Sequence, residues 1–102
     1  MTSEKVIEVL RGYEEQLRAM GIVPIRDNAA VDPLGQMSHV AWMCGEAIRF
    51  VEAGRIEKAH RWLGFIQGAL WALGVTTVEA AKRANMPEGA TFDAGSPAVG
   101  GS

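Results

Sequence analysis

Two histidines and a single cysteine are the residues whose types could hold a metal ion or act as nucleophiles. Glu57 and His60 form a Glu-x-x-His pair, the spacing that carboxylate-bridged di-iron bundles use. Such a centre requires a second pair, but the residue three positions before the other histidine, His39, is the neutral amide Gln36. We therefore expect a surface glutamate and a histidine in the first turn of a helix, with no metal site.

Cys44 lies five positions after His39, roughly 140° around a helix, so these two side chains are not expected to chelate a zinc ion together. A lone thiol of this kind is typical of core packing rather than of a nucleophile. The sequence contains no glycine-rich phosphate loop, no Gly-x-Ser-x-Gly and no His-Glu-x-x-His. We therefore predict no catalytic residue, no cofactor and no enzymatic activity.

Polar and aromatic side chains recur at helical spacing on the second and third predicted helices. Their positions are His39, Trp42, Glu46 and Arg49 on the second helix, and His60, Gly64, Gln67 and Trp71 on the third, with Arg61 adjacent. Facing rows of this composition would form a groove in which Trp rings stack on a ligand and Arg or His side chains donate to it. The candidate binding residues are Trp42, Arg49, Arg61, Gln67 and Trp71. Alternatively, the tryptophans are edges of the core, with their indole N–H groups satisfied by Gln67 or Glu46.

These positions depend on helices, and the hydrophobic spacing predicts four of them. They run from about Ser3 to Met20, from Asp32 to Gly54, from about Arg55 to Leu73 and from Thr76 to about Asn85. On each long helix, apolar residues three or four positions apart form one face that we expect to be buried. These residues are Val6, Leu10, Tyr13, Leu17 and Met20; Leu34, Met37, Ala41, Cys44, Ile48 and Val51; and Ile56, Ala59, Leu63, Ile66, Leu70 and Leu73. No stretch alternates as a strand would, so we predict an all-α bundle of three long helices and one short helix.

Capping residues mark the helix boundaries. Asp32 is placed to cap the second helix, with Pro33 at its first position. For the fourth helix we expect a capping box between Thr76 and Glu79. A glycine that can adopt the left-handed conformation follows each long helix, at Gly21, Gly54 and Gly74. The short connections after the second and third helices predict that helices two, three and four are antiparallel neighbours.

Length and composition define the class of protein. The 102 residues suffice for one domain, which we place at residues 1–86; residues 87–102, rich in Gly, Ala, Ser and Pro, predict a flexible tail. The 10 basic and 12 acidic residues argue against a general nucleic-acid binder. The most apolar run, from Leu63 to Val75, has 13 residues, fewer than the roughly 20 that a membrane span requires. Since no signal peptide is evident and one cysteine permits no intrachain disulfide, we expect a cytoplasmic protein.

The third helix carries a second apolar face. Trp62, Phe65, Ala69 and Ala72 follow one another at steps of 3, 4 and 3, and Gly64 and Gly68 lie beside them. Either this helix is central in a monomeric bundle, or the second face joins copies of the chain. An 86-residue bundle has little volume in which to enclose three tryptophans, and two-fold dimers are the commonest oligomers. We therefore expect a homodimer or higher oligomer, with an interface formed by Trp62, Gly64, Phe65, Gly68 and Ala72.

The segment from His60 to Gly74 resembles a group of small helical proteins encoded by tailed phages and prophages. The likeness extends from about His39 to Pro87, and its most specific part is Arg-Trp-Leu-Gly at 61–64 with Gln-Gly at 67–68 and Leu-Trp at 70–71. This resemblance implies expression in the cytoplasm of a bacterial host during infection. It implies no reaction and assigns no catalytic residue.

A small phage protein without an active site is expected to act by binding. We expect a homo-oligomeric helical module that binds and modulates a host protein through an exposed apolar helix face. The alternative is a sponge that sequesters a small anionic ligand, such as a nucleotide immune signal, in a Trp/Arg-lined pocket, helped by the basic residues between Arg55 and Arg61. A structural or regulatory phage component is a third class. Neither a membrane nor a nucleic acid is an expected partner.

Overall fold

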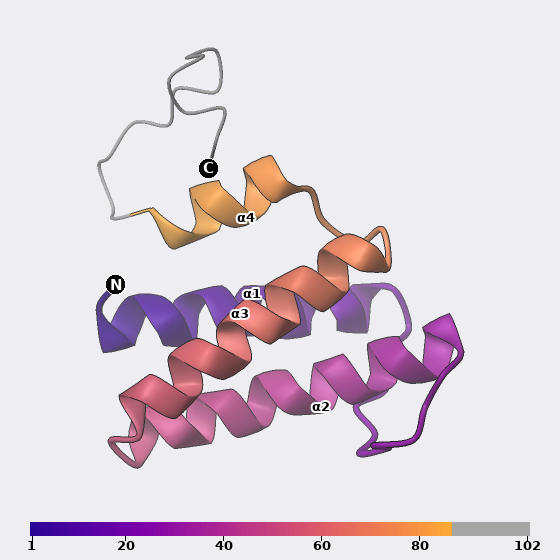
Figure 1. Ribbon diagram of the computed structural model, residues 1–102, viewed down its shortest axis with the longest axis horizontal. Coiled ribbons are helices and arrows are strands. Elements are labelled where there is room, and N and C mark those ends of the chain that lie inside the picture. Colours follow the sequence, from indigo (N-terminus) through magenta and orange to yellow (C-terminus); the bar gives the residue numbers. More distant parts are fainter. Residues whose placement is uncertain (87–102) are drawn as a thin grey trace.

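The computed structural model describes residues 1–86, and its regular structure there is entirely helical (Figure 1). The three long helices are α1 (Ser3–Ala19), α2 (Pro33–Glu52) and α3 (Ile56–Ala72), and the short helix is α4 (Val78–Asn85). The predicted all-α bundle of three long helices and one short helix is therefore confirmed. Within these residues no helix is long and apolar enough to cross a membrane. The predicted flexible tail, residues 87–102, lies outside the described residues.

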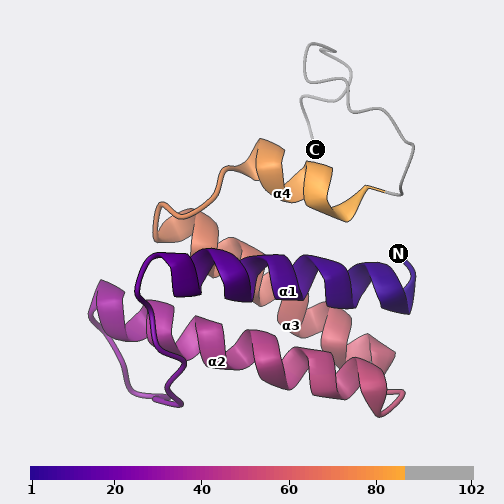
Figure 2. The ribbon, with the colours of Figure 1, turned by 180° about the vertical axis from the view of Figure 1, so that it is seen from behind.

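α2 is the helix that joins the bundle together. It packs extensively against both α1 and α3, whereas α1 and α3 touch each other over a smaller area. α2 and α3 form the antiparallel pair that the short connection between them predicts (Figure 1). α1 lies behind this pair in Figure 1 and in front of it in Figure 2, so it covers one side of the pair only.

The core is one continuous cluster where α1, α2 and α3 meet. Its side chains are each less than a tenth exposed: Val6, Val9, Leu10, Tyr13, Leu17, Ile22, Val40, Ala41, Met43, Cys44, Ala47, Ile48, Val51, Ala59, Leu63, Ile66 and Leu70. Cys44 is fully buried among them, as expected of core packing. Burial, with a smaller contribution from the Glu14 carboxylate, raises the pKa of its thiol to about 12. The thiol therefore stays protonated and unreactive in the folded chain.

Each long helix ends in the same way, at a glycine with positive φ. These are Gly21, Gly54 and Gly74, with φ of 83°, 79° and 77°. The residue after each glycine donates its N–H to the carbonyl five residues earlier, from Ile22 to Leu17, from Arg55 to Phe50 and from Val75 to Leu70, at 3.0, 2.8 and 2.8 Å. This is the Schellman motif, and it confirms the predicted helix ends.

Two residues assigned to the buried faces are in fact exposed. Met20 is 50% exposed, because the chain turns at the glycine that follows it and Ile22, beyond the turn, occupies the buried position at the end of α1. Leu34 is 64% exposed, because the buried residues of α2 begin only at Val40 and the first turn contributes nothing to the core.

The helix caps agree with the sequence for α2 and differ by one residue for α4. The Asp32 carboxylate accepts a backbone N–H from the first turn of α2 at 3.0 Å, as predicted. In α4 the cap is Thr77, whose hydroxyl accepts the N–H of Ala80 at 3.0 Å. Glu79 is then the second helical residue rather than the third, so the predicted capping box with Thr76 does not form.

α4 has no buried residue and packs mainly against α1, not against α3 as the sequence predicted. Polar contacts hold the segment in place. The Gln16 side-chain amide donates to the Val75 carbonyl at 3.1 Å, just before α4 begins. Near the other end, Gln67 and Asn85 exchange two side-chain hydrogen bonds of 2.7 and 2.8 Å.

Candidate functional site

The side of α3 that faces away from the core is apolar and uncovered. We define this outward face by five exposed residues: Gly64, Phe65, Gly68, Trp71 and Ala72. Phe65 and Trp71 keep 60% and 57% of their surface exposed. A Cβ added at Gly64 or Gly68 would meet no atom within 4 Å. Each helical glycine costs about 1 kcal/mol relative to alanine, and no contact among residues 1–86 offsets that cost.

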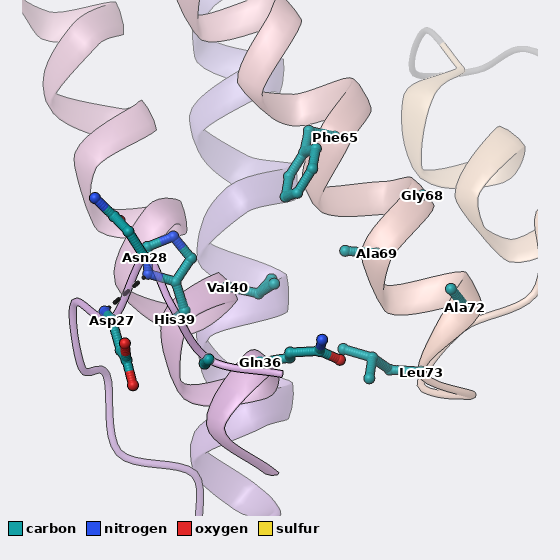
Figure 3. Close-up of a pocket in the computed structure, with 11 residues that line it drawn as sticks. Asp27, Asn28, Gln36, His39, Val40, Phe65, Gly68, Ala69, Ala72 and Leu73 are labelled. Carbon is teal, nitrogen blue, oxygen red and sulfur yellow. Dashed lines mark hydrogen bonds between the residues drawn. The ribbon is translucent and has the colours of Figure 1, made fainter. Parts of the chain in front are cut away.

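A hollow of about 620 Å³ opens beside the outward face, where α3 ends and α2 begins (Figure 3). We call it the α2–α3 hollow. Its lining combines the connection between α1 and α2 with the two helices: Asp27, Asn28, Ala30, Gln36, His39, Val40, Phe65, Gly68, Ala69, Ala72 and Leu73. The α3 side of the hollow is wholly apolar, and the polar groups lie on the other side. This combination of an apolar wall and a few polar groups is typical of binding sites.

Hydrogen bonds fix the polar side of the α2–α3 hollow. The backbone N–H of Asp27 donates to Nδ1 of His39 at 3.1 Å, and the Asp27 carboxylate accepts the N–H of Ala29 at 3.0 Å (Figure 3). The N–H of Ile25 donates to the Ser38 carbonyl at 3.0 Å. Because Nδ1 of His39 accepts a hydrogen bond, a neutral ring carries its proton on Nε2. These bonds hold the connection between α1 and α2 against α2, so the connection forms an ordered wall of the hollow.

Aromatic rings fill the space between α2 and α3 on the other side of His39. His39 stacks on Trp42 with ring centroids 5.4 Å apart, Trp42 lies 6.2 Å from Trp62, and Trp62 meets Phe50 edge-on at 4.8 Å. Cations cover this aromatic row: the Lys58 ammonium lies 4.5 Å from the Phe50 ring, and Arg26 lies 5.4 Å from the Trp42 ring. These ring faces are already occupied by the chain's own side chains.

A second, smaller hollow of about 250 Å³ separates α3 from α4. It is lined by Gln67, Gly68, Trp71, Val78, Ala81, Lys82 and Asn85. Gln67 also donates to the Tyr13 hydroxyl at 2.9 Å, so one amide joins α1, α3 and α4. Burial raises the pKa of the Tyr13 phenol, because the ring lies in the core. Gly68 lines both hollows, so only this residue, which has no side chain, separates them on the surface of α3 at that point. We call the surface at Gly64 and Gly68 the glycine ridge.

The first turn of α3 is cationic. Arg55, Lys58 and Arg61 line a shallow depression there together with one acid, Glu57. At the other end of α3, Asp27 is the one formally charged residue among the described lining of the α2–α3 hollow. The surface beside α3 is thus cationic at its start, whereas beside its later turns Asp27 lines one hollow and Lys82 lines the other.

The five candidate binding residues do not share one groove. Gln67 and Trp71 line the hollow beside α4, and Arg61 lies in the second turn of α3 at the cationic depression. Trp42 belongs to the aromatic row, and Arg49 pairs with the Glu46 carboxylate at 3.2 Å. The rows separate because Gln67 bonds to residues of α1 and α4, whereas Trp42 contacts Trp62 between α2 and α3.

Among the five candidate interface residues, four lie on the outward face of α3, namely Gly64, Phe65, Gly68 and Ala72. Trp62 is half-buried in the aromatic row instead. The sequence reading also missed the residues that wall the α2–α3 hollow from the other side, above all Asp27 and Asn28. These two residues mark the segment as a loop, and no periodicity in a loop indicates which helix it will pack against.

Neither a protein-family model, nor a curated protein, nor a solved structure matches the chain. Function must therefore follow from the surface of the bundle itself. The resemblance to phage proteins stays a prediction from the sequence.

Proposed function

We propose that this chain is a non-enzymatic binding protein, that it docks a helix of another protein on the outward face of α3, and that its target is a host protein in an infected bacterial cell. One observation carries the proposal: α3 exposes two aromatic side chains, Phe65 and Trp71, on either side of a glycine ridge that has a hollow along each flank. Contiguous apolar surface of this kind marks interaction sites on proteins.

The physical gain from docking lies in these exposed side chains. Covering a large apolar side chain that is about half exposed removes enough surface from water to contribute roughly 1 kcal/mol or more. Gly64 and Gly68 have no side chain to hold a partner's backbone away, so an incoming helix could approach closely. Apolar anchors three or four positions apart on that helix would then enter the hollows on both sides of the ridge.

The competing proposal, sequestration of a small anion, has weaker support. The larger hollow presents a carboxylate, Asp27, and no formal cation among its described lining residues. The cations Arg55, Lys58 and Arg61 lie around a separate depression. Two of them, Arg55 and Lys58, already cover the Phe50 ring. An anion would therefore meet a carboxylate in the larger hollow, an open surface at the depression or, among the described residues of the smaller hollow, a single cation, Lys82.

The proposal is tested by capturing host proteins from a bacterial lysate on the tagged chain and on two variants. Gly68→Leu places a side chain on the ridge, and Phe65→Ser removes an exposed anchor. Ile25→Ser is the matched control, because Ile25 is 52% exposed and lies outside the face. Wild type and control are expected to retain the same host protein, and both face variants to lose it while keeping their helical circular dichroism.

Equal capture by all four chains would overturn the docking proposal. A panel of cyclic and linear nucleotides in a thermal-shift assay addresses the alternative. We expect no shift, and a clear stabilisation by a nucleotide would favour the sponge over the docking module.

A further inference from the structure

The outward face of α3 carries both a projection and a recess. Phe65 projects from it with 60% of its surface exposed. The same ring forms one edge of the α2–α3 hollow, about 620 Å³, which continues along the helix at Gly68, Ala69 and Ala72. A surface that holds a knob and a matching hole is complementary to its own two-fold image, since each copy can fill the recess of the other.

Charge along α3 points to the same occupant. Arg55, Lys58 and Arg61 lie around its first two turns, and beside its later turns Asp27 lines the α2–α3 hollow while Lys82 lines the hollow toward α4. Arg61 makes no ion pair with the described residues, and Arg55 and Lys58 contact an aromatic ring and no carboxylate there. Two such helices packed antiparallel would bring the cationic start of each one toward Asp27 of the other. A parallel arrangement would oppose cations to cations.

We propose that, in the absence of a target, a second copy of this chain covers the outward face of α3. The two α3 helices cross antiparallel about a two-fold axis near the ridge between Gly64 and Gly68, and Phe65 of each protomer enters the α2–α3 hollow of the other. This inference rests on the proposed function, because it names the resting occupant of the same docking face. A host protein then binds by displacing the second copy.

The size of the face suits a weak assembly that a target can displace. α3 has 17 residues, which makes it about 25 Å long. A strip of that length covering α3 and the walls of the hollows on both sides is roughly 20 Å wide, about twice the 8–10 Å between packed helices. The resulting footprint of roughly 500 Å² lies below the ~800 Å² per partner of a standard interface, in the range of transient associations.

Sedimentation velocity of the full chain at micromolar concentration tests the inference. Wild type is expected to sediment with twice the chain mass, and Gly68→Leu as a single chain. Gly12→Leu is the matched control: Gly12 is also an exposed helical glycine with no atom within 4 Å of an added Cβ, but it lies on α1. This control is expected to remain dimeric, so a general effect of leucine on a helix surface is separated from loss of the interface.

A wild-type chain that sediments as a monomer, or a Gly68→Leu chain as dimeric as Gly12→Leu, would overturn the homodimer. The lysate experiment distinguishes this failure from that of the proposed function. If the wild type is monomeric but Gly68→Leu still loses the host protein, the docking face stands and only the second copy is wrong. If wild type is dimeric and Gly68→Leu monomeric while both capture the host protein equally, the face serves self-association alone.

Discussion

The space between α2 and α3 is closed at one end and open at the other, and the difference comes from side-chain size at equivalent positions. Trp62 and Ala69 are seven residues apart, so they lie on the same side of α3, two turns from each other. Trp62 meets the Trp42 and Phe50 rings and fills the gap between the helices. Ala69, beside Gly68, leaves the α2–α3 hollow. One helix pair thus provides a packed half and a docking half.

The largest effect that we predict concerns the closed half. Trp62→Ala removes a half-buried ring that packs against two others and lies 5.9 Å from the Lys58 ammonium, so the free energy of unfolding should fall by about 3 kcal/mol. Urea denaturation followed by far-UV circular dichroism measures this change. Phe65→Ala serves as the control: that ring lines the α2–α3 hollow and is 60% exposed, so its loss should cost less than about 1 kcal/mol. Equal costs would mean that the two halves do not differ in packing.

Filling the open half of the space between α2 and α3 should weaken association without a comparable change in the free energy of unfolding. Ala69→Phe places a ring where the α2–α3 hollow now lies, so association through the outward face should weaken by about tenfold or more, equivalent to about 1.4 kcal/mol. The unfolding free energy of the monomer should change by less than that, because the ring enters open space. Sedimentation at several concentrations gives the association constant. A variant that binds as tightly as wild type would remove the hollow from the interface.

We expect the hydrogen bonds of Gln67, on the side of α3 that faces α4, to protect α4 from local unfolding. Gln67→Leu breaks the bonds to Tyr13 and Asn85, and each such bond contributes about 1 kcal/mol. Since α4 has no buried residue, this loss should raise amide hydrogen exchange in α4 while α1–α3 keep their protection. Mass-spectrometric hydrogen exchange reports both regions at once. Unchanged exchange in α4 would show that its contact with α1 alone holds it.

A smaller effect is expected from the charges at the two ends of α3. Asp27→Asn removes the one formal charge among the described residues of the hollow, so the homodimer should weaken a few-fold at low salt. The difference from wild type should fade above physiological salt because exposed charges are screened. The same substitution strengthening the dimer would contradict the antiparallel arrangement.

The sequence predicts the helices well and their neighbours less well. Local hydrogen bonds determine the helix ends, at Gly21, Gly54 and Gly74 and at the Asp32 cap. The helix ends can therefore be predicted from a few adjacent residues. Gln67 finds its partner Tyr13 across 54 positions, and helical spacing gives its face but not the element opposite that face. The hollow depends likewise on where the loop around Asp27 settles against His39. Local chemistry therefore predicted the fold and the exposed ridge, whereas the shape of the site arises from tertiary packing.

The smallest effect that we predict is the labelling of Cys44 by a thiol reagent. Its thiol is fully buried with a pKa of about 12, so a maleimide should label it only after unfolding. Because this pKa lies above the ordinary value of 9.0, the folded state keeps the proton longer than the unfolded chain. The thiol therefore favours folding below pH 9, and that contribution is lost as the pH rises from about 9 toward 12. Rapid labelling of the native chain at neutral pH would contradict this environment.

Because Cys44 is buried and unreactive, cross-linking is the most direct test of the central claim, that the outward face of α3 joins two copies of the chain. Gly64→Cys puts a reactive thiol on the ridge, and Gly12→Cys puts one on an equally open position of α1. With a short bis-maleimide linker, Gly64→Cys should yield a covalent dimer and Gly12→Cys only single chains. Equal yields from both variants, or a dimer from Gly12→Cys alone, would contradict the assignment of α3 as the interface between two copies.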